Sequence, residues 1–207
     1  MRQWMVLMAT FVTLGADAQA AEPWNLVDES DGVKIWTREL TNSSIRELKA
    51  ETVLTVAAER IWSVLLDVES YPEFMPHVVE SKLLKKLPDG YIHYQRLDPP
   101  LVSERDFTVR VTHTTDADTG VYERVWKETD ATDTKPRDGV VRMPINRGKW
   151  VLRQVDANKT KVLYYVHADV GGAIPDWIAG RANRISVPKM LVAVEKRARA
   201  QSVAASD

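Results

Sequence analysis

The chain of 207 residues contains no cysteine, which excludes a disulfide framework, a thiolate metal site and a lipid-modified cysteine. Its four histidines show no pairing at metal-ligand spacing, and we expect no metal and no cofactor. Motifs for serine hydrolysis, phosphate loops and dinucleotide binding are also missing. The 28 basic residues nearly balance 29 acidic ones, so there is no electrostatic reason to expect a nucleic-acid partner.

Residues 1–20 have the pattern of a secretory signal peptide. A positive start is followed by an apolar stretch and by the small-x-small sequence Ala18-Gln19-Ala20. The alternative is an uncleaved anchor, for which the apolar stretch is shorter than the ~20 residues that a membrane span needs. We expect an exported protein that starts at Ala21, periplasmic if the host is a Gram-negative bacterium. Residues 21–200 then form one domain and residues 201–207 a disordered tail.

The first part of this domain mixes strand and helix patterns. Val33–Leu40 and Ile45–Leu54 are strand candidates separated by a short polar segment, which predicts an N-terminal hairpin. Thr55 is suited as the N-cap of a helix that continues to about Val68. A second, shorter helical turn is expected over Asp67–Pro76.

Residues 78–168 alternate strand patterns with turn signals, which predicts an antiparallel meander. In one strand Phe107, Val109 and Val111 alternate with polar residues and are expected to face inward. A hairpin, two helices, a meander and one C-terminal helix predict an α+β fold. Its compact solution is a curved antiparallel sheet wrapped around the long C-terminal helix, with all helices on one side. Such a sheet can enclose an internal hydrophobic cavity.

The segment after the last strand combines two glycines with a long helical pattern interrupted at Pro188. At 100° per residue, Ile174, Ile178, Ala182 and Ile185 share one face. The opposite face holds Val187, Met190, Leu191 and Val194. Because proline removes a helix hydrogen bond, we expect a bend that lets both faces meet one body. The segment is either a helix that closes an ordinary core or a lid.

Two motifs give this chain a specific resemblance. Ser103-Glu104-Arg105-Asp106-Phe107 opens a strand, and Gly171-Gly172-Ala173-Ile174-Pro175-Asp176-Trp177 connects the last strand to the last helix. In this order and separation they resemble the START family of lipid-transfer domains, over about residues 24–198. The resemblance implies a helix-grip fold, in which the sheet and the long helix enclose a tunnel for one lipid.

The resemblance also implies two loops at the tunnel mouth. The expected gate residues are Leu101, Val102, Gly171, Gly172, Ile174 and Trp177. Apolar residues on adjacent loops are suited to transient contact with a bilayer interface, where tryptophan is favoured. For Trp177 the alternative is that it only packs the helix onto the sheet.

The family often places an arginine in the tunnel, six positions after the arginine of the R-D-F motif. That position is Val111 here, and a glutamate of sterol-binding relatives corresponds to Gln95. We therefore expect no charged pair in the tunnel and a less charged ligand. The predicted ligand-binding residues are Tyr94, Gln95, Phe107, Val109, Val111, Tyr164, Ile178, Ala182 and Ile185.

The expected function is to bind, and possibly to transfer, a single lipid or other hydrophobic molecule. We expect a monomer without catalytic residues. One alternative is a cyclase/aromatase-like enzyme on the same helix-grip fold, because fold does not decide function. That enzyme needs acid or base groups in the tunnel, and the predicted inward positions offer none. The other alternative is a ligand sensor that acts through a protein partner.

Overall fold

The computed structural model describes residues 22–40, 43–116, 118–131, 134–172, 174 and 176–204. The side chains of residues 43–44, 176–183 and 202–204 lie outside that description.

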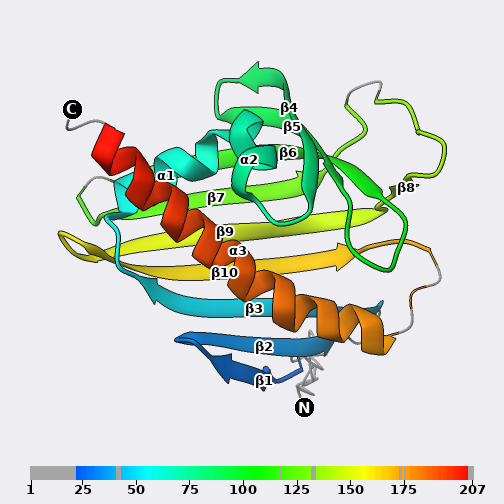
Figure 1. The fold of residues 1–207 in the computed structure, drawn as a ribbon, viewed down its shortest axis with the longest axis horizontal. Helices are drawn as coiled ribbons and strands as arrows, with labels where there is room; N and C mark the ends of the chain where they lie inside the picture. Colours follow the sequence, from blue (N-terminus) through cyan, green and yellow to red (C-terminus); the bar gives the residue numbers. More distant parts are fainter. Residues whose placement is uncertain are drawn as a thin grey trace, which may run out of the picture.

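The described residues form one ten-stranded sheet that curves behind the helices (Figure 1). The strands are β1 (Asn25–Ser30), β2 (Val33–Leu40), β3 (Ser43–Leu54), β4 (Val78–Leu87), β5 (Gly90–Leu97), β6 (Arg105–Asp116), β7 (Val121–Glu128), β8 (Val141–Arg142), β9 (Ile145–Asp156) and β10 (Lys159–Asp169). Their order is β1-β2-β3-β10-β9-β7-β6-β5-β4, so the sheet is not closed. All pairs are antiparallel except that of β8, which pairs parallel with β6.

The predicted hairpin and meander are confirmed, and the structure adds how they join. β3 pairs with β10 along eight residues from His167 to Thr160, which brings the start of the domain beside its end. β1 extends the hairpin by one further strand. The pairing of β3 with β10 is long-range, and local sequence patterns do not specify it.

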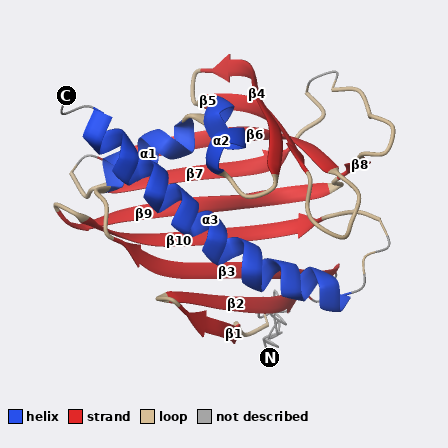
Figure 2. Cartoon of the chain, viewed as in Figure 1, coloured by secondary structure: helices blue, strands red, loops and turns tan. Residues whose placement is uncertain are grey.

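All described helices lie on one face of the sheet (Figure 2). They are α1 (Ala58–Leu66), a 3₁₀ turn (Val68–Ser70), α2 (Tyr71–Phe74) and α3 (Asp176–Ala204). The long helix α3 crosses the sheet diagonally, and its C-terminal part lies beside α1. The predicted fold class, a curved antiparallel sheet with a long C-terminal helix, is therefore confirmed. α3 also extends to Ala204, four residues into the segment expected to be a disordered tail.

The expected N-cap of α1 is wrong. The helix starts after Ala57 without a side-chain cap, and the carboxamide oxygen of Gln154 on β9 accepts a hydrogen bond from the Ala58 amide at 2.6 Å. Thr55 instead donates its amide and its hydroxyl to Glu195 of α3, at 2.8 and 2.9 Å. The Gln154 side chain of β9 therefore caps the first amide of α1. The hydrogen bonds of Thr55 instead connect the end of β3 to α3.

One face of α3 packs into the core, as the sequence predicted for Val187, Leu191 and Val194. α3 continues through Pro188 as one helix, and of the face expected before the proline only Ile185 has a described side chain within it. Ile185 lies two residues, or 200°, before Val187 and is 44% exposed. Ile185 therefore points to solvent, while Val187 is buried.

Candidate functional site: an internal cavity and its mouth

A cavity of about 290 Å³ lies between the sheet, α2 and the middle of α3. Four of the predicted ligand-binding residues line it: Gln95, Phe107, Val109 and Tyr164. α2 adds Tyr71, and the residue after it, Met75, also lines the space.

Two predicted lining residues are placed elsewhere. Tyr94 is adjacent to Gln95 on β5, and neighbouring residues of a strand point to opposite faces of the sheet. Its hydroxyl donates to Asp106 Oδ2 at 3.1 Å, and its ring lies under the guanidinium of Arg137 at 5.5 Å. Val111 does face inward but is fully buried in the core, outside the cavity lining. The expectation that Tyr94 and Gln95 both face the ligand is therefore wrong for Tyr94.

The contribution of α3 also differs from the prediction. Ser186, Val187 and Met190 line the cavity, whereas the exposed Ile185 does not. Ile178 and Ala182 lie outside the residues whose side chains are described. Of the three α3 residues predicted to face the ligand, only Ile185 has a described side chain, and it points to solvent, whereas Val187 is buried against the sheet.

Sequence reasoning missed one charged lining residue, Arg124 of β7. It is only 5% exposed, and its Nε donates to the Tyr91 hydroxyl at 2.9 Å. The alternation of β7 carried the signal: Arg124 shares the side of the buried Trp126, while Val125 between them is exposed. The cavity lining therefore includes one charged side chain that the sequence analysis did not predict.

Aromatic side chains form the wall beside Arg124. Trp126 stacks on Tyr164 with ring centroids 5.9 Å apart, and Trp150 contacts Tyr164 at 4.9 Å. Gly148 faces Trp126 across β7 and β9, where a Cβ atom would lie 2.5 Å from the indole ring. The missing side chain lets the indole lie flat on the strand. Trp126 Nε1 donates to Asn146 Oδ1 at 2.8 Å, which fixes the orientation of the ring.

The remaining polar groups of the cavity are not suited to proton transfer near neutral pH. Burial, with a further contribution from the charge of Arg124, lowers the pKa of His93 to about 3, so the ring is neutral. Ser81 donates its proton to the Val68 carbonyl and therefore accepts from His93 Nε2 at 2.8 Å. Tyr71 donates to the Leu65 carbonyl at 2.7 Å, and burial raises its pKa.

The two predicted mouth loops lie together around a second hollow of about 570 Å³. Leu101, Val102, Gly172 and Ile174 line it, as does Arg105 of the R-D-F motif. Arg105 Nε donates to the Val170 carbonyl at 3.4 Å, and another of its nitrogens donates to the Ser103 carbonyl. One arginine thus bridges the two loops.

Backbone conformation also marks these loops. Gly171 and Gly172 have φ values of 65° and 72°, which L-residues with side chains rarely adopt. Leu101 adopts a φ of 70° and is 93% exposed at the tip of the first loop. Trp177 is the one predicted gate residue whose side chain lies outside the description.

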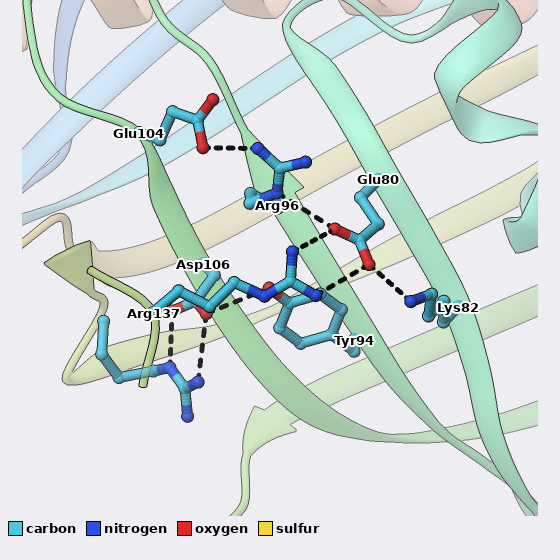
Figure 3. A network of polar contacts seen from close by, with 8 residues as sticks. Glu80, Lys82, Tyr94, Arg96, Glu104, Asp106 and Arg137 are labelled. Carbon is cyan, nitrogen blue, oxygen red and sulfur yellow. Dashed lines mark hydrogen bonds and ion pairs between the residues drawn. The ribbon is translucent and has the colours of Figure 1, made fainter. Parts of the chain in front are cut away.

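On the opposite face of the sheet, a polar network holds the chain before β8 (Figure 3). Glu80 accepts from Arg137 at 2.7 and 3.0 Å and from Arg96 at 3.1 Å. The buried carboxylate of Asp106, the second residue of R-D-F, accepts from Arg142 Nε at 2.6 Å. Asp106 is therefore structural, while its neighbour Arg105 contacts the mouth.

The described residues contain no group of three His, Asp or Glu side chains arranged as a metal site. Within the same part of the chain, no helix has the length and apolar content to cross a bilayer.

Comparisons with known proteins agree with this geometry. Residues 54–195 match the family described as "Polyketide cyclase / dehydrase and lipid transport". An uncharacterized protein of Pseudomonas aeruginosa is 29% identical over 176 residues, covering 84% of this chain and 86% of the relative. A STAR-related lipid transfer protein of Xanthomonas axonopodis is 31% identical with a TM-score of 0.74, over 85% of this chain and 98% of that one.

More distant structures share the fold. Human StAR-related lipid transfer protein 5 has a TM-score of 0.76 at 16% identity, over 86% of this chain and 88% of its own. The Zhui aromatase/cyclase of a Streptomyces species has a TM-score of 0.54 at 16% identity, over 75% of this chain and 94% of that one. The fold thus occurs in carriers and in enzymes. From the family match and the 31% identity over most of the domain, the chain belongs to the START-type family of polyketide cyclases and lipid-transport proteins.

Proposed function

We propose that the protein carries one hydrophobic molecule in the cavity between the sheet and α3. The observation that carries this proposal is the composition of the lining, in which apolar side chains such as Phe107, Val109, Val187 and Met190 predominate. Burial of apolar ligand surface there stabilises the complex by roughly 25 cal/mol per Å². The family membership supports the same conclusion.

The proposed mechanism is physical. Release requires the mouth loops to separate, which breaks the hydrogen bonds of Arg105 to Ser103 and Val170. Leu101, almost fully exposed at the loop tip, is placed to enter a bilayer interface and to favour opening there.

The test is native mass spectrometry of the protein purified from its native host. A stoichiometric hydrophobic ligand, followed by its transfer between vesicles, supports a carrier. Leu101→Asp should slow transfer without weakening binding in solution, and Val155→Asp, at an exposed site on β9, is the matched control. Slowing by both variants to the same extent would contradict a specific role for the loop.

A cyclase/aromatase-like enzyme is the second candidate, favoured by the polar group of Arg124 in the cavity lining and by Tyr91, which accepts its hydrogen bond. It is the weaker one because the titratable side chains beside them, His93 and Tyr71, are locked in their neutral forms near pH 7. A ligand-free protein that cyclises a polyketide-like compound would establish the enzyme and refute the carrier.

We further propose that the protein is exported and acts outside the cytoplasm, on the evidence of the signal-peptide pattern of residues 1–20. N-terminal sequencing of the protein from its host should give Ala21 as the first residue. A chain that retains residues 1–20 and fractionates with the membrane would support the uncleaved anchor instead.

A further inference from the structure

Arg124 is a buried charge without a countercharge. Among the described residues, no carboxylate lies within ion-pair distance of its guanidinium, and its one hydrogen bond goes to the neutral Tyr91 hydroxyl. The rings of Tyr91 and Trp126 lie 5.7 and 5.6 Å from its central carbon. Burial of an unpaired charge is costly, and two cation–π contacts offset only part of that cost.

The neighbouring elements offer no anion to complete the site. β5 contributes Tyr91 and the neutral His93, and α2 contributes Tyr71, whose hydroxyl is already bonded to Leu65. β10 contributes the ring of Tyr164, whose pKa is raised by burial. Arginine has five N–H donors, of which one is used here, and Arg124 lines the cavity. Its remaining N–H donors are therefore available to a ligand in the cavity.

We infer that the cavity binds an amphiphile with one anionic oxygen head, a carboxylate of the fatty-acid type, held by Arg124. This inference rests on the proposed function, because it assigns the chemical class of the molecule carried. A planar carboxylate accepts two parallel hydrogen bonds from a guanidinium, and such charge-assisted bonds are the stronger class.

The position of Arg124 gives the orientation of this ligand. It pairs with Trp150 across β7 and β9 and lies four residues before Glu128, the end of β7 next to the mouth side of the sheet. At ~3.4 Å per residue this places Arg124 about 14 Å along the strand from that end. The head enters first and the apolar tail extends toward the mouth.

The volume gives the size. With ~30 Å³ for each water-sized group, a cavity of about 290 Å³ accommodates about ten heavy atoms. Octanoate, with eight carbons and a carboxylate, is of this size and is the probe, and 1-octanol is its neutral counterpart.

The test is isothermal titration of both probes into wild type and Arg124→Met, which keeps the length of the side chain and removes its charge. Wild type should bind octanoate at least ~10-fold more tightly than 1-octanol, since charge-assisted hydrogen bonds are worth a factor of about 10 to 100. R124M should lose this preference and retain 1-octanol. Arg110→Met, at an exposed position on β6 paired with Asp89, should change neither affinity.

Folding of R124M is checked by circular dichroism, and Arg124→Lys provides the second variant. R124K keeps the charge but not the planar fork, so it should retain a reduced preference for octanoate. Equal affinities of wild type for both probes, or a preference that survives in R124M, would overturn the anionic ligand and leave a hydrophobic carrier. Tighter binding of octyl phosphate than of octanoate would overturn the carboxylate. Binding of no probe, with no lipid in the native preparation, would refute the proposed function itself.

Discussion

Replacing Glu80 by glutamine should destabilise the protein by an amount that depends on pH. The hydrogen bonds from Arg137 and Lys82 lower the pKa of Glu80 from an ordinary value of 4.5 to about 2. A shift of this size corresponds to ~3 kcal/mol between the folded and unfolded states. Arg137 and Lys82 are about half exposed, so solvent screening reduces the expected loss to ~1–2 kcal/mol.

The sign follows from the lowered pKa. The folded state binds the proton less readily than the unfolded state, so the stabilisation is fully present above pH ~4.5 and is lost as the pH falls toward 2. The difference between wild type and E80Q in the free energy of unfolding should therefore be constant from pH 7 to 5 and shrink from pH 4.5 to 3. Urea unfolding followed by tryptophan fluorescence measures it.

Glu123→Gln is the matched control, because Glu123 has a single partner, Lys149, at 3.4 Å and both side chains are about 40% exposed. The free energy of unfolding of E123Q should be less than ~0.5 kcal/mol below that of wild type at every pH. A loss for E80Q no larger than that for E123Q at pH 7, or one that does not shrink below pH 4.5, would refute the role assigned to the network.

Three further outcomes are expected. Leu191→Ala, at a fully buried position of α3, should lower the free energy of unfolding measured in urea by ~2–5 kcal/mol. Val192→Ala, at the exposed neighbouring position, should lower it by less than ~0.5 kcal/mol. Equal losses in the two variants would contradict the packing of α3. Gly172→Pro replaces a φ of 72° by about −65°, so it should slow lipid transfer between vesicles more than it weakens equilibrium binding. Gly32→Pro, in the remote β1–β2 turn, should leave the transfer rate unchanged, and equal loss of binding and transfer in G172P would contradict a gate at this loop.

The sequence predicted most elements because their signals are local. The hairpin strands, the meander and the core face of α3 each follow from apolar periodicity within one segment. The error at the start of α1 arose because a distant segment decides the outcome. Thr55 has the chemistry of an N-cap, but Glu195, 140 residues later, takes its hydrogen bonds.

The candidate site was predicted only in part, for two physical reasons. Strand parity could have separated Tyr94 from Gln95 and placed Arg124 beside Trp126, since alternation is a local rule. No local rule shows that the outer face at Tyr94 is covered by Arg137, or that α3 stays unbroken at Pro188.

The sequence by itself determined the family, the fold class and the two mouth motifs, because these depend on residue types at short spacing. Only the tertiary structure decided which buried residues face a cavity, because burial is the sum of contacts from β5, β7, β9, β10, α2 and α3. It alone placed the Arg124 guanidinium among aromatic rings, with no carboxylate of the described residues within ion-pair distance. That absence of a partner depends on every surrounding strand and helix at once, and it is the basis on which we infer an anionic ligand.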